Sequence, residues 1–292
     1  MNQQSRKQST QRCSISAVLP FLFFLVAVNL RPPITSVGPL LEQVGNAFSL
    51  GESALGFLGS APLLAFAVFS PLAPRLGTFF GIERAVFGAL MTVTLGILIR
   101  SYAGLPGLIA GTALIGFGVA VCNVLVPALV KQDFSDHVTL ATAIYTSSMT
   151  VVASVASATA VPIAGWLDWR ASLALWALPA ALTSVLWLPR IWYNTPRPTP
   201  SRGNGTTLPV HRSRDAWMVT LFMGLQSTSF YTMITWLPTI VTSTGASASN
   251  AGIYLSIYQF AGLLSGFAVP YLMEDPDNQV KTTVGASLPI VV

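Results

Sequence analysis

One arginine in this sequence follows directly on a hydrophobic stretch. The sixteen residues from Ile15 to Leu30 carry no charge and are almost all apolar, and Arg31 comes next, followed by Pro32 and Pro33. An arginine near the middle of a membrane costs about 2.5–3.5 kcal/mol on insertion scales, and neither proline has a backbone N–H to donate. A charge and a helix break at one depth are tolerated only where the chain faces protein or water. The pattern therefore predicts a polar site inside a membrane, where the planar guanidinium suits a planar anion.

Arg31 also has a purely structural interpretation. About ten residues separate it from the expected end of its hydrophobic segment, which is roughly 15 Å of helix. A long arginine side chain could nearly reach water from there, or it could hydrogen-bond a backbone carbonyl. Both interpretations remain open at the level of the sequence.

Further polar side chains lie within hydrophobic segments. Asn29 lies two residues before Arg31, and Asn123, Gln226 and Tyr231 lie deep in later segments. Such groups can contact a polar solute, or they can join neighbouring helices through hydrogen bonds worth about 0.6 kcal/mol on average. All ten acidic residues lie in connecting segments or at segment ends. The sequence therefore offers no obvious carboxylate for a buried proton relay.

The composition indicates which elements carry these side chains. Hydrophobic residues make up 52% of the 292 residues and charged residues only 9%, whereas a soluble domain carries about 25% charged residues. A helix needs about 20 apolar residues to cross a bilayer. Eight runs of about that length predict an all-α membrane protein, at roughly 15–41, 53–73, 85–100, 104–130, 138–164, 171–189, 216–241 and 251–273. The fifth run is crowded with small residues, and Tyr145 is its one candidate for a polar cavity.

A segment rich in Pro, Gly, Ser and Arg divides these runs. The sequence predicts a tail at 1–14, a bundle of six spans at 15–189, a linker at 190–215 and a partial second bundle at 216–292. The last residues, 282–292, resemble half of a ninth span, because a helix of that length reaches only about half way across a bilayer. We therefore expect the sequence to be a truncated product or a fragment of a longer gene.

The distribution of Lys and Arg predicts the orientation. With the N-terminus in the cytoplasm, twelve of these residues fall in inner segments and two, Arg100 and Arg170, fall in outer ones. Cytoplasmic loops carry such an excess, so we expect a multi-pass protein of the plasma (inner) membrane. The net charge of +5 then follows from topology and anionic lipid headgroups, and no nucleic acid is needed to explain it.

Several motifs together resemble one transporter family. The sequence is similar to the cyanate permease and 2-nitroimidazole transporter branch of the major facilitator superfamily in five stretches, at 30–44, 56–77, 80–90, 118–134 and 217–241. Two of these stretches contain the elements "LRPP" and "NVLVPALVKQDF", which are specific in combination. The resemblance implies a helical bundle with a six-span N-terminal half and an incomplete C-terminal half, since full members have twelve spans. The sequence departs from the family's usual loop after span 2, where only Gly81 and Arg84 match and the acid is absent.

The resemblance also implies a function. Members are secondary transporters that work by alternating access, and the family's cavity is lined by spans 1, 4, 7 and 10, which makes Asn123, Gln226 and Tyr231 the expected partners of Arg31. The implied solute is a small anion such as cyanate or a polar planar nitroheterocycle. The alternative is a truncated membrane protein that is inactive in transport or acts as a scaffold. We find no nucleophile, metal or phosphate-loop motif, so we expect no enzyme, no cofactor, no metal and no obligate protein partner besides solute and lipid.

Overall fold

The computed structural model describes residues 21–134, 137–192 and 213–272. The expected N-terminal tail at 1–14, most of the expected linker and the expected half span at 282–292 lie outside these residues. Every regular element in the described part of the chain is helical. This confirms the all-α class that the hydrophobic runs predict.

The helices follow the predicted order. Residues 21–30 form the first helix. After it come α2 (Pro32–Thr35), η1 (Gly38–Leu40), α3 (Leu41–Phe48), α4 (Glu52–Phe69), η2 (Ser70–Leu72), α5 (Ala73–Phe80), α6 (Ile82–Tyr102), α7 (Gly104–Asp133), α8 (Val138–Trp166), α9 (Trp169–Ala174), α10 (Ala177–Trp192), α11 (Arg214–Ser243) and α12 (Ala248–Leu272). Six helical segments between Phe21 and Trp192 are long and apolar enough to cross a membrane. The helices α11 and α12 lie where the seventh and eighth spans are expected, and their role as spans stays a prediction.

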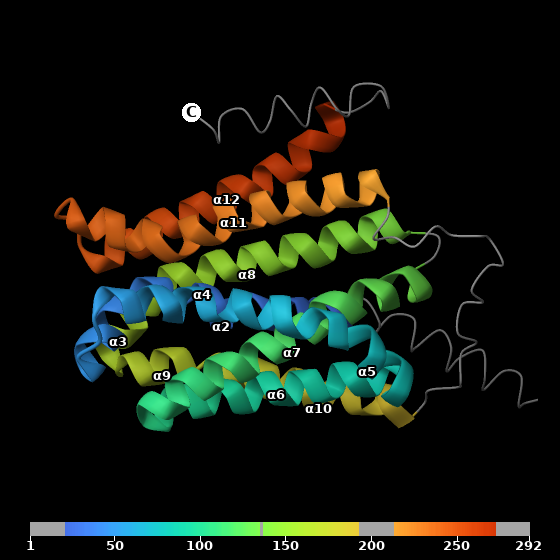
Figure 1. The fold of residues 1–292 in the computed structure, drawn as a ribbon, viewed down its shortest axis with the longest axis horizontal. Helices are drawn as coiled ribbons and strands as arrows, with labels where there is room; N and C mark the ends of the chain where they lie inside the picture. The colour runs from blue at the N-terminus through green and yellow to red at the C-terminus, as the bar shows by residue number, and fades with distance from the viewer. Residues whose placement is uncertain (1–20, 135–136, 193–212, 273–292) are drawn as a thin grey trace, which may run out of the picture.

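The long helices run side by side and reverse direction at each connection (Figure 1). We call the end where α10 finishes and α11 begins the linker end. The connections α5–α6 and α7–α8 also lie at the linker end, whereas α3–α4, α8–α9 and α11–α12 connect at the opposite end. The helix α12 lies along α8, and α11 lies beside α12 and η1. All connections expected on one side of the membrane are therefore gathered at one end of the molecule.

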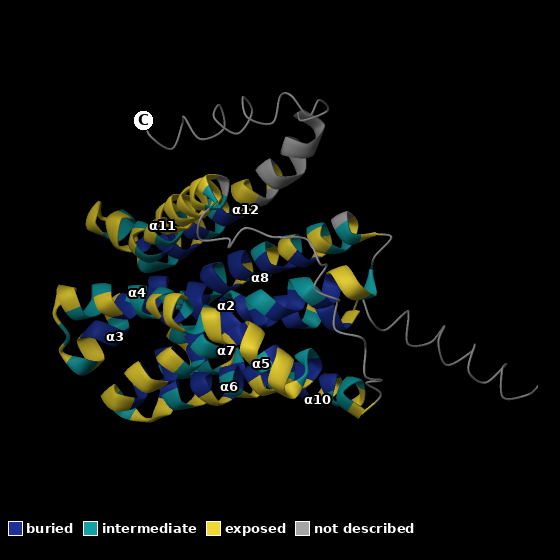
Figure 2. Ribbon diagram, turned by 45° about the vertical axis from the view of Figure 1, so that its right-hand side comes forward, coloured by how far each residue is buried: buried dark blue, intermediate teal, exposed yellow. Residues whose placement is uncertain are grey.

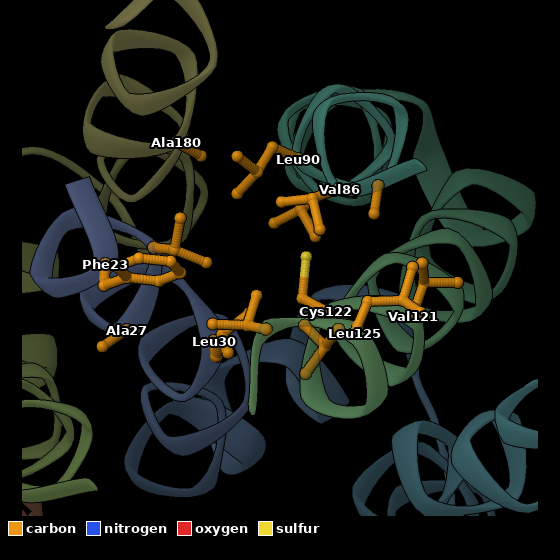
Figure 3. Close-up of a cluster of buried hydrophobic side chains, with 14 of the residues drawn as sticks. Phe23, Ala27, Leu30, Val86, Leu90, Val121, Cys122, Leu125 and Ala180 are labelled. Carbon is orange, nitrogen blue, oxygen red and sulfur yellow. The ribbon is translucent and has the colours of Figure 1, made fainter. Parts of the chain in front are cut away.

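The main apolar core lies between the first helix, α6, α7 and α10. Figure 3 shows side chains from all four helices meeting around Cys122. Glycines let α6 and α7 approach closely: a Cβ added at Gly111 would lie 2.4 Å from the backbone nitrogen of Arg100, and one at Gly96 would lie 2.9 Å from that of Ile115. Small residues serve this purpose in membrane helix pairs, where apolar side chains gain little by leaving lipid.

The first span is broken where the sequence predicts a break. Its helix stops at Leu30, and Arg31 is the N-cap of α2, in whose first turn Pro32 and Pro33 lie. Proline is favoured in a first turn because its missing N–H would have no helical partner there. The chain then turns through η1 into α3. Arg31 is therefore positioned by local sequence at a discontinuity between two helical segments.

The helix α11 packs on the first six spans only through its second half, from Phe230 onward. Its residues 217–229 are all exposed, as the yellow ribbon in Figure 2 shows, whereas Ile234 and Pro238 are buried. A Cβ added at Gly38 would lie 2.8 Å from the carbonyl oxygen of Ile234, and one at Gly59 would lie 2.3 Å from Cγ2 of Thr235. The described part of the bundle is thus closed against α11 at the opposite end, and α11 stays exposed toward the linker end.

Candidate functional site

Arg31 presents a charge with unused hydrogen-bond donors. Its side chain is half-buried, and Cζ lies 4.8 Å from the centroid of the Phe230 ring on α11. None of the described residues accepts a hydrogen bond from its guanidinium or pairs with its charge. A cation over an aromatic face gains about 0.5–2 kcal/mol, which holds the guanidinium in place without occupying its N–H groups. Those donors remain available to a ligand.

Two tyrosines lie within reach of this charge. Tyr231, on α11, packs against the same Phe230 ring that the guanidinium faces, and Tyr145, on α8, belongs to the apolar cluster against which Tyr231 packs. The Tyr145 side chain is 5% exposed, and its hydroxyl has no hydrogen-bond partner. The Tyr231 ring packs edge-on against Phe66 and Phe230, with centroid separations of 6.4 and 5.3 Å. The first, fifth and seventh long helical segments therefore gather a guanidinium, two hydroxyls and an aromatic face.

Asn29 is directed toward another helix. Its amide Nδ2 donates to the carbonyl of Leu25 at 2.7 Å and to Oγ1 of Thr183 on α10 at 2.8 Å. The residue is 2% exposed, and Oδ1 is buried without a partner. In the described structure this amide joins the first helix to α10, and its predicted contact with solute stays a prediction.

Asn123 and Gln226 have no contact with Arg31 among the described interactions. Asn123, on α7, is half-buried, and Gln226, on α11, is exposed. Residues four apart on a helix share a face, so Gln226 lies one turn from Phe230 toward the linker end. Of the five residues predicted for the site, the structure brings Arg31 and Tyr231 together, and the places of the other three leave their role in binding untested.

Arg100 is a buried charge, although the sequence pattern places it in an outer connecting segment. It lies in the last turn of α6 and is 2% exposed. Its Nη1 donates to the carbonyl oxygen of Pro33. The turn after α2 leaves that carbonyl without a backbone donor, because the N–H of Val37 bonds Ile34 instead. Arg100 thus stabilises the break beside Arg31, and only its place at the edge of a hydrophobic run could have suggested burial.

The sequence analysis also did not predict a second set of buried polar groups, which joins α12, α8 and α2. Gln259 on α12 is 1% exposed, and its Nε2 donates to Oγ of Ser157 on α8 at 2.8 Å. The Ser157 hydroxyl lies 3.3 Å from the carbonyl oxygen of Thr35 in α2. The broken segment that carries Arg31 is therefore linked through α8 to α12, a helix of the second half.

Two helices are held together by charge at the linker end. Arg190, near the end of α10, forms an ion pair with Asp133, the last residue of α7, and their side chains are only 9% and 2% exposed. Its Cζ also lies 5.2 Å from the ring of Phe23 and 5.1 Å from that of Trp187. From the sequence, Arg190 contributes only to the excess of Lys and Arg that predicts the orientation. Its ion pair could not be predicted, because Asp133 is far away in the chain.

Comparison with known proteins identifies relatives over most of the chain. A family model described as Major Facilitator Superfamily matches residues 18–292. An uncharacterised transporter of Bacillus subtilis, YycB, is 39% identical over 87% of this chain, and the 2-nitroimidazole transporter of Escherichia coli is 37% identical over 87%. The cyanate transport protein CynX of Escherichia coli is 26% identical over 91% of this chain. The chain spans 63%, 65% and 70% of the lengths of these three relatives.

Two solved structures share the fold. The D-xylose-proton symporter matches with a TM-score of 0.65 at 16% identity, covering 87% of this chain and 68% of its own. A bacterial homologue of the human lysosomal transporter Spinster, in an inward-facing and unoccupied conformation, matches with a TM-score of 0.69 at 16% identity, covering 88% of this chain and 63% of its own. At this level of identity the likeness shows the arrangement of helices alone.

Proposed function

This chain belongs to the Major Facilitator Superfamily, and on that premise we propose that it serves in the secondary transport of a small, planar, anionic or polar solute across the cell membrane. One relative is named for 2-nitroimidazole and another for cyanate, and both are small planar molecules. In this proposal Arg31 contacts the solute's negative or electron-rich atoms. Tyr231 and Tyr145 supply hydroxyls, and Phe230 supplies an aromatic face.

The observation that carries this proposal is the unpartnered guanidinium of Arg31. It lies between helices of the two halves, over Phe230, with no described acceptor for its N–H groups. A fixed positive charge favours an anion, and the attraction is stronger where water is scarce. A planar fork of donors beside aromatic rings also favours a flat solute over a bulky one. Asn123 and Gln226 remain proposed contacts for a conformation in which α11 has moved.

The packing of α11 supports alternating access. Transporters of this kind expose a central site to one side at a time by moving one bundle against the other. Here α11 closes against Gly38 and Gly59 at the opposite end, and its residues 217–229 stay exposed toward the linker end. The excess of Lys and Arg predicts that the linker end, and with it the N-terminus, lies in the cytoplasm. In this proposal the exposed half of α11 lies toward the cytoplasm.

The test measures binding and transport separately. The purified chain is heated in detergent with cyanate or 2-nitroimidazole, since a ligand that binds the folded state raises Tm, and uptake of each labelled solute is measured in proteoliposomes. We expect Arg31→Gln to weaken anion binding about 10- to 100-fold, because a hydrogen bond to a charged group contributes about 1.5–3 kcal/mol. Arg31→Lys should restore part of it, since the charge returns without the planar fork. Arg75→Gln, at an exposed arginine of α5, is the matched control.

The outcomes divide the alternatives. If Arg31→Gln binds both solutes as the unmodified chain does, Arg31 has a structural role and the proposed site is wrong. Saturable binding that depends on Arg31 but comes without uptake would support the second candidate, a membrane protein that does not transport.

A further inference from the structure

A second arginine forms a separate polar site near the opposite end. The guanidinium of Arg100 is buried, its Nη1 donates to the carbonyl oxygen of Pro33, and both Nε and Nη2 are buried with no partner. These nitrogens belong to a residue that lines a largely enclosed cavity of about 30 Å³. The walls come from the first span, α4, α6, α7, α9 and α11, and they are apolar apart from Arg100, Thr112, Thr235 and exposed backbone.

The charge of Arg100 has no counter-charge in this cavity. An arginine keeps its proton in a protein, so burial cannot be relieved by deprotonation. Removing an ion from water is costly unless an opposite charge and further hydrogen bonds compensate it. No carboxylate is found among the described residues that line the cavity, and one backbone carbonyl supplies only a partial negative charge. A water molecule could fill a remaining hydrogen bond, but it would leave the net charge uncompensated.

From this combination we propose that the cavity binds one small inorganic anion of the chloride class. Arg100 supplies the positive charge and two unpartnered donors, Nε and Nη2, and Thr235 lines the same cavity, while the hydroxyl of Thr112 already donates to the carbonyl oxygen of Leu108. A cavity needs roughly 10–15 Å³ to admit a water-sized particle, so about 30 Å³ admits a single small ion and excludes an organic acid. Because Thr235 belongs to α11, the ion is held only while α11 is packed against the first six spans.

This site is distinct from the proposed solute site at Arg31. The Arg31 guanidinium lies over Phe230, whereas the cavity is lined by Ile234 and Thr235, one helical turn further along α11. Arg31 is not among the residues that line the cavity. The two arginines can therefore be separated by mutation, and failure of either proposal leaves the other standing.

The experiment replaces chloride with an anion that is too large for the cavity. Thermal unfolding of the purified chain in detergent is followed while sodium chloride replaces sodium gluconate at constant ionic strength. We expect Tm to rise and saturate, by on the order of 5 °C when chloride reaches about 100 times its Kd. Equilibrium dialysis with radioactive chloride should show saturable binding of one ion per chain. Arg31→Gln should keep both responses, and Arg100→Gln should lose both.

A second variant covers the case in which Arg100→Gln does not fold. Val37→Leu enlarges a side chain of the cavity wall and leaves the hydrogen bond between Arg100 and Pro33 untouched, so chloride should bind at least tenfold more weakly. An unchanged chloride response in Val37→Leu would contradict the proposal. So would equal Tm values for the unmodified chain in chloride and gluconate, or a response that Arg31→Gln abolishes and Arg100→Gln keeps.

Discussion

The ion pair between Asp133 and Arg190 should stabilise the bundle far more than an exposed pair does. Their side chains are 2% and 9% exposed, so Asp133→Asn leaves the Arg190 guanidinium charged and buried. Breaking a buried pair by removing one partner costs about 3–5 kcal/mol. The rings of Phe23 and Trp187 still face the guanidinium in this variant, and they offset only about 0.5–2 kcal/mol. We expect Asp133→Asn to lower Tm by roughly 10 °C, since 1 kcal/mol shifts Tm by about 2–4 °C in a chain of this size.

A double variant tests whether the loss of stability comes from an unpaired buried charge. Asp133→Asn combined with Arg190→Met removes both charges, and replacing a buried pair by uncharged side chains is often nearly neutral. We therefore expect the double variant to be more stable than either single variant. Thermal unfolding in detergent, followed by the exposure of Cys122 to a thiol-reactive dye in chains that carry Cys13→Ser, reports all three, because Cys122 is buried in the core.

An exposed pair provides the control. Arg170 and Asp168 lie 3.4 Å apart with side chains 39% and 45% exposed, and such pairs contribute about 0–1 kcal/mol. Arg170→Met should therefore leave Tm almost unchanged. The reasoning is refuted if Asp133→Asn has no larger effect than Arg170→Met, or if the two single effects simply add in the double variant.

Two further predictions concern packing and orientation. Gly111→Ala should lower Tm by several degrees, because its Cβ would lie 2.4 Å from the Arg100 backbone nitrogen, whereas Gly88→Ala, with nothing within 4 Å, should leave Tm unchanged or raise it slightly. Equal Tm values for the two variants would contradict the close packing of α6 on α7. A reporter fused after Arg202 should be cytoplasmic and one fused after Ser247 external, since the excess of Lys and Arg predicts that topology. The reverse pair of reporter signals would overturn the proposed orientation.

The sequence alone determined the helical segments and the break in the first span. A membrane-spanning chain must satisfy its backbone hydrogen bonds internally, so runs of apolar residues become helices wherever they are long enough. Pro32 and Pro33 act on the backbone of their own turn, and that effect needs no tertiary contact. For the same reason the local sequence is sufficient to place Arg31 beside the break.

Only the tertiary structure decided which polar side chains meet. Asn29 bonds Thr183, and Gln259 bonds Ser157, across more than a hundred residues of chain. Tyr145 packs from α8 into the cluster against which Tyr231 also packs, although only its polar character in a segment of small residues had marked it as a candidate.

Arg100 shows most clearly what the local sequence cannot predict. A lysine or arginine at the end of a hydrophobic run has the same local sequence whether it reaches water or turns inward. Its burial depends on what the neighbouring helices offer, and here the carbonyl of Pro33 and the close approach at Gly111 provide the acceptor and the space. Contacts of this kind follow from the packing of α6 against the first span and α7, which no local pattern of residues specifies.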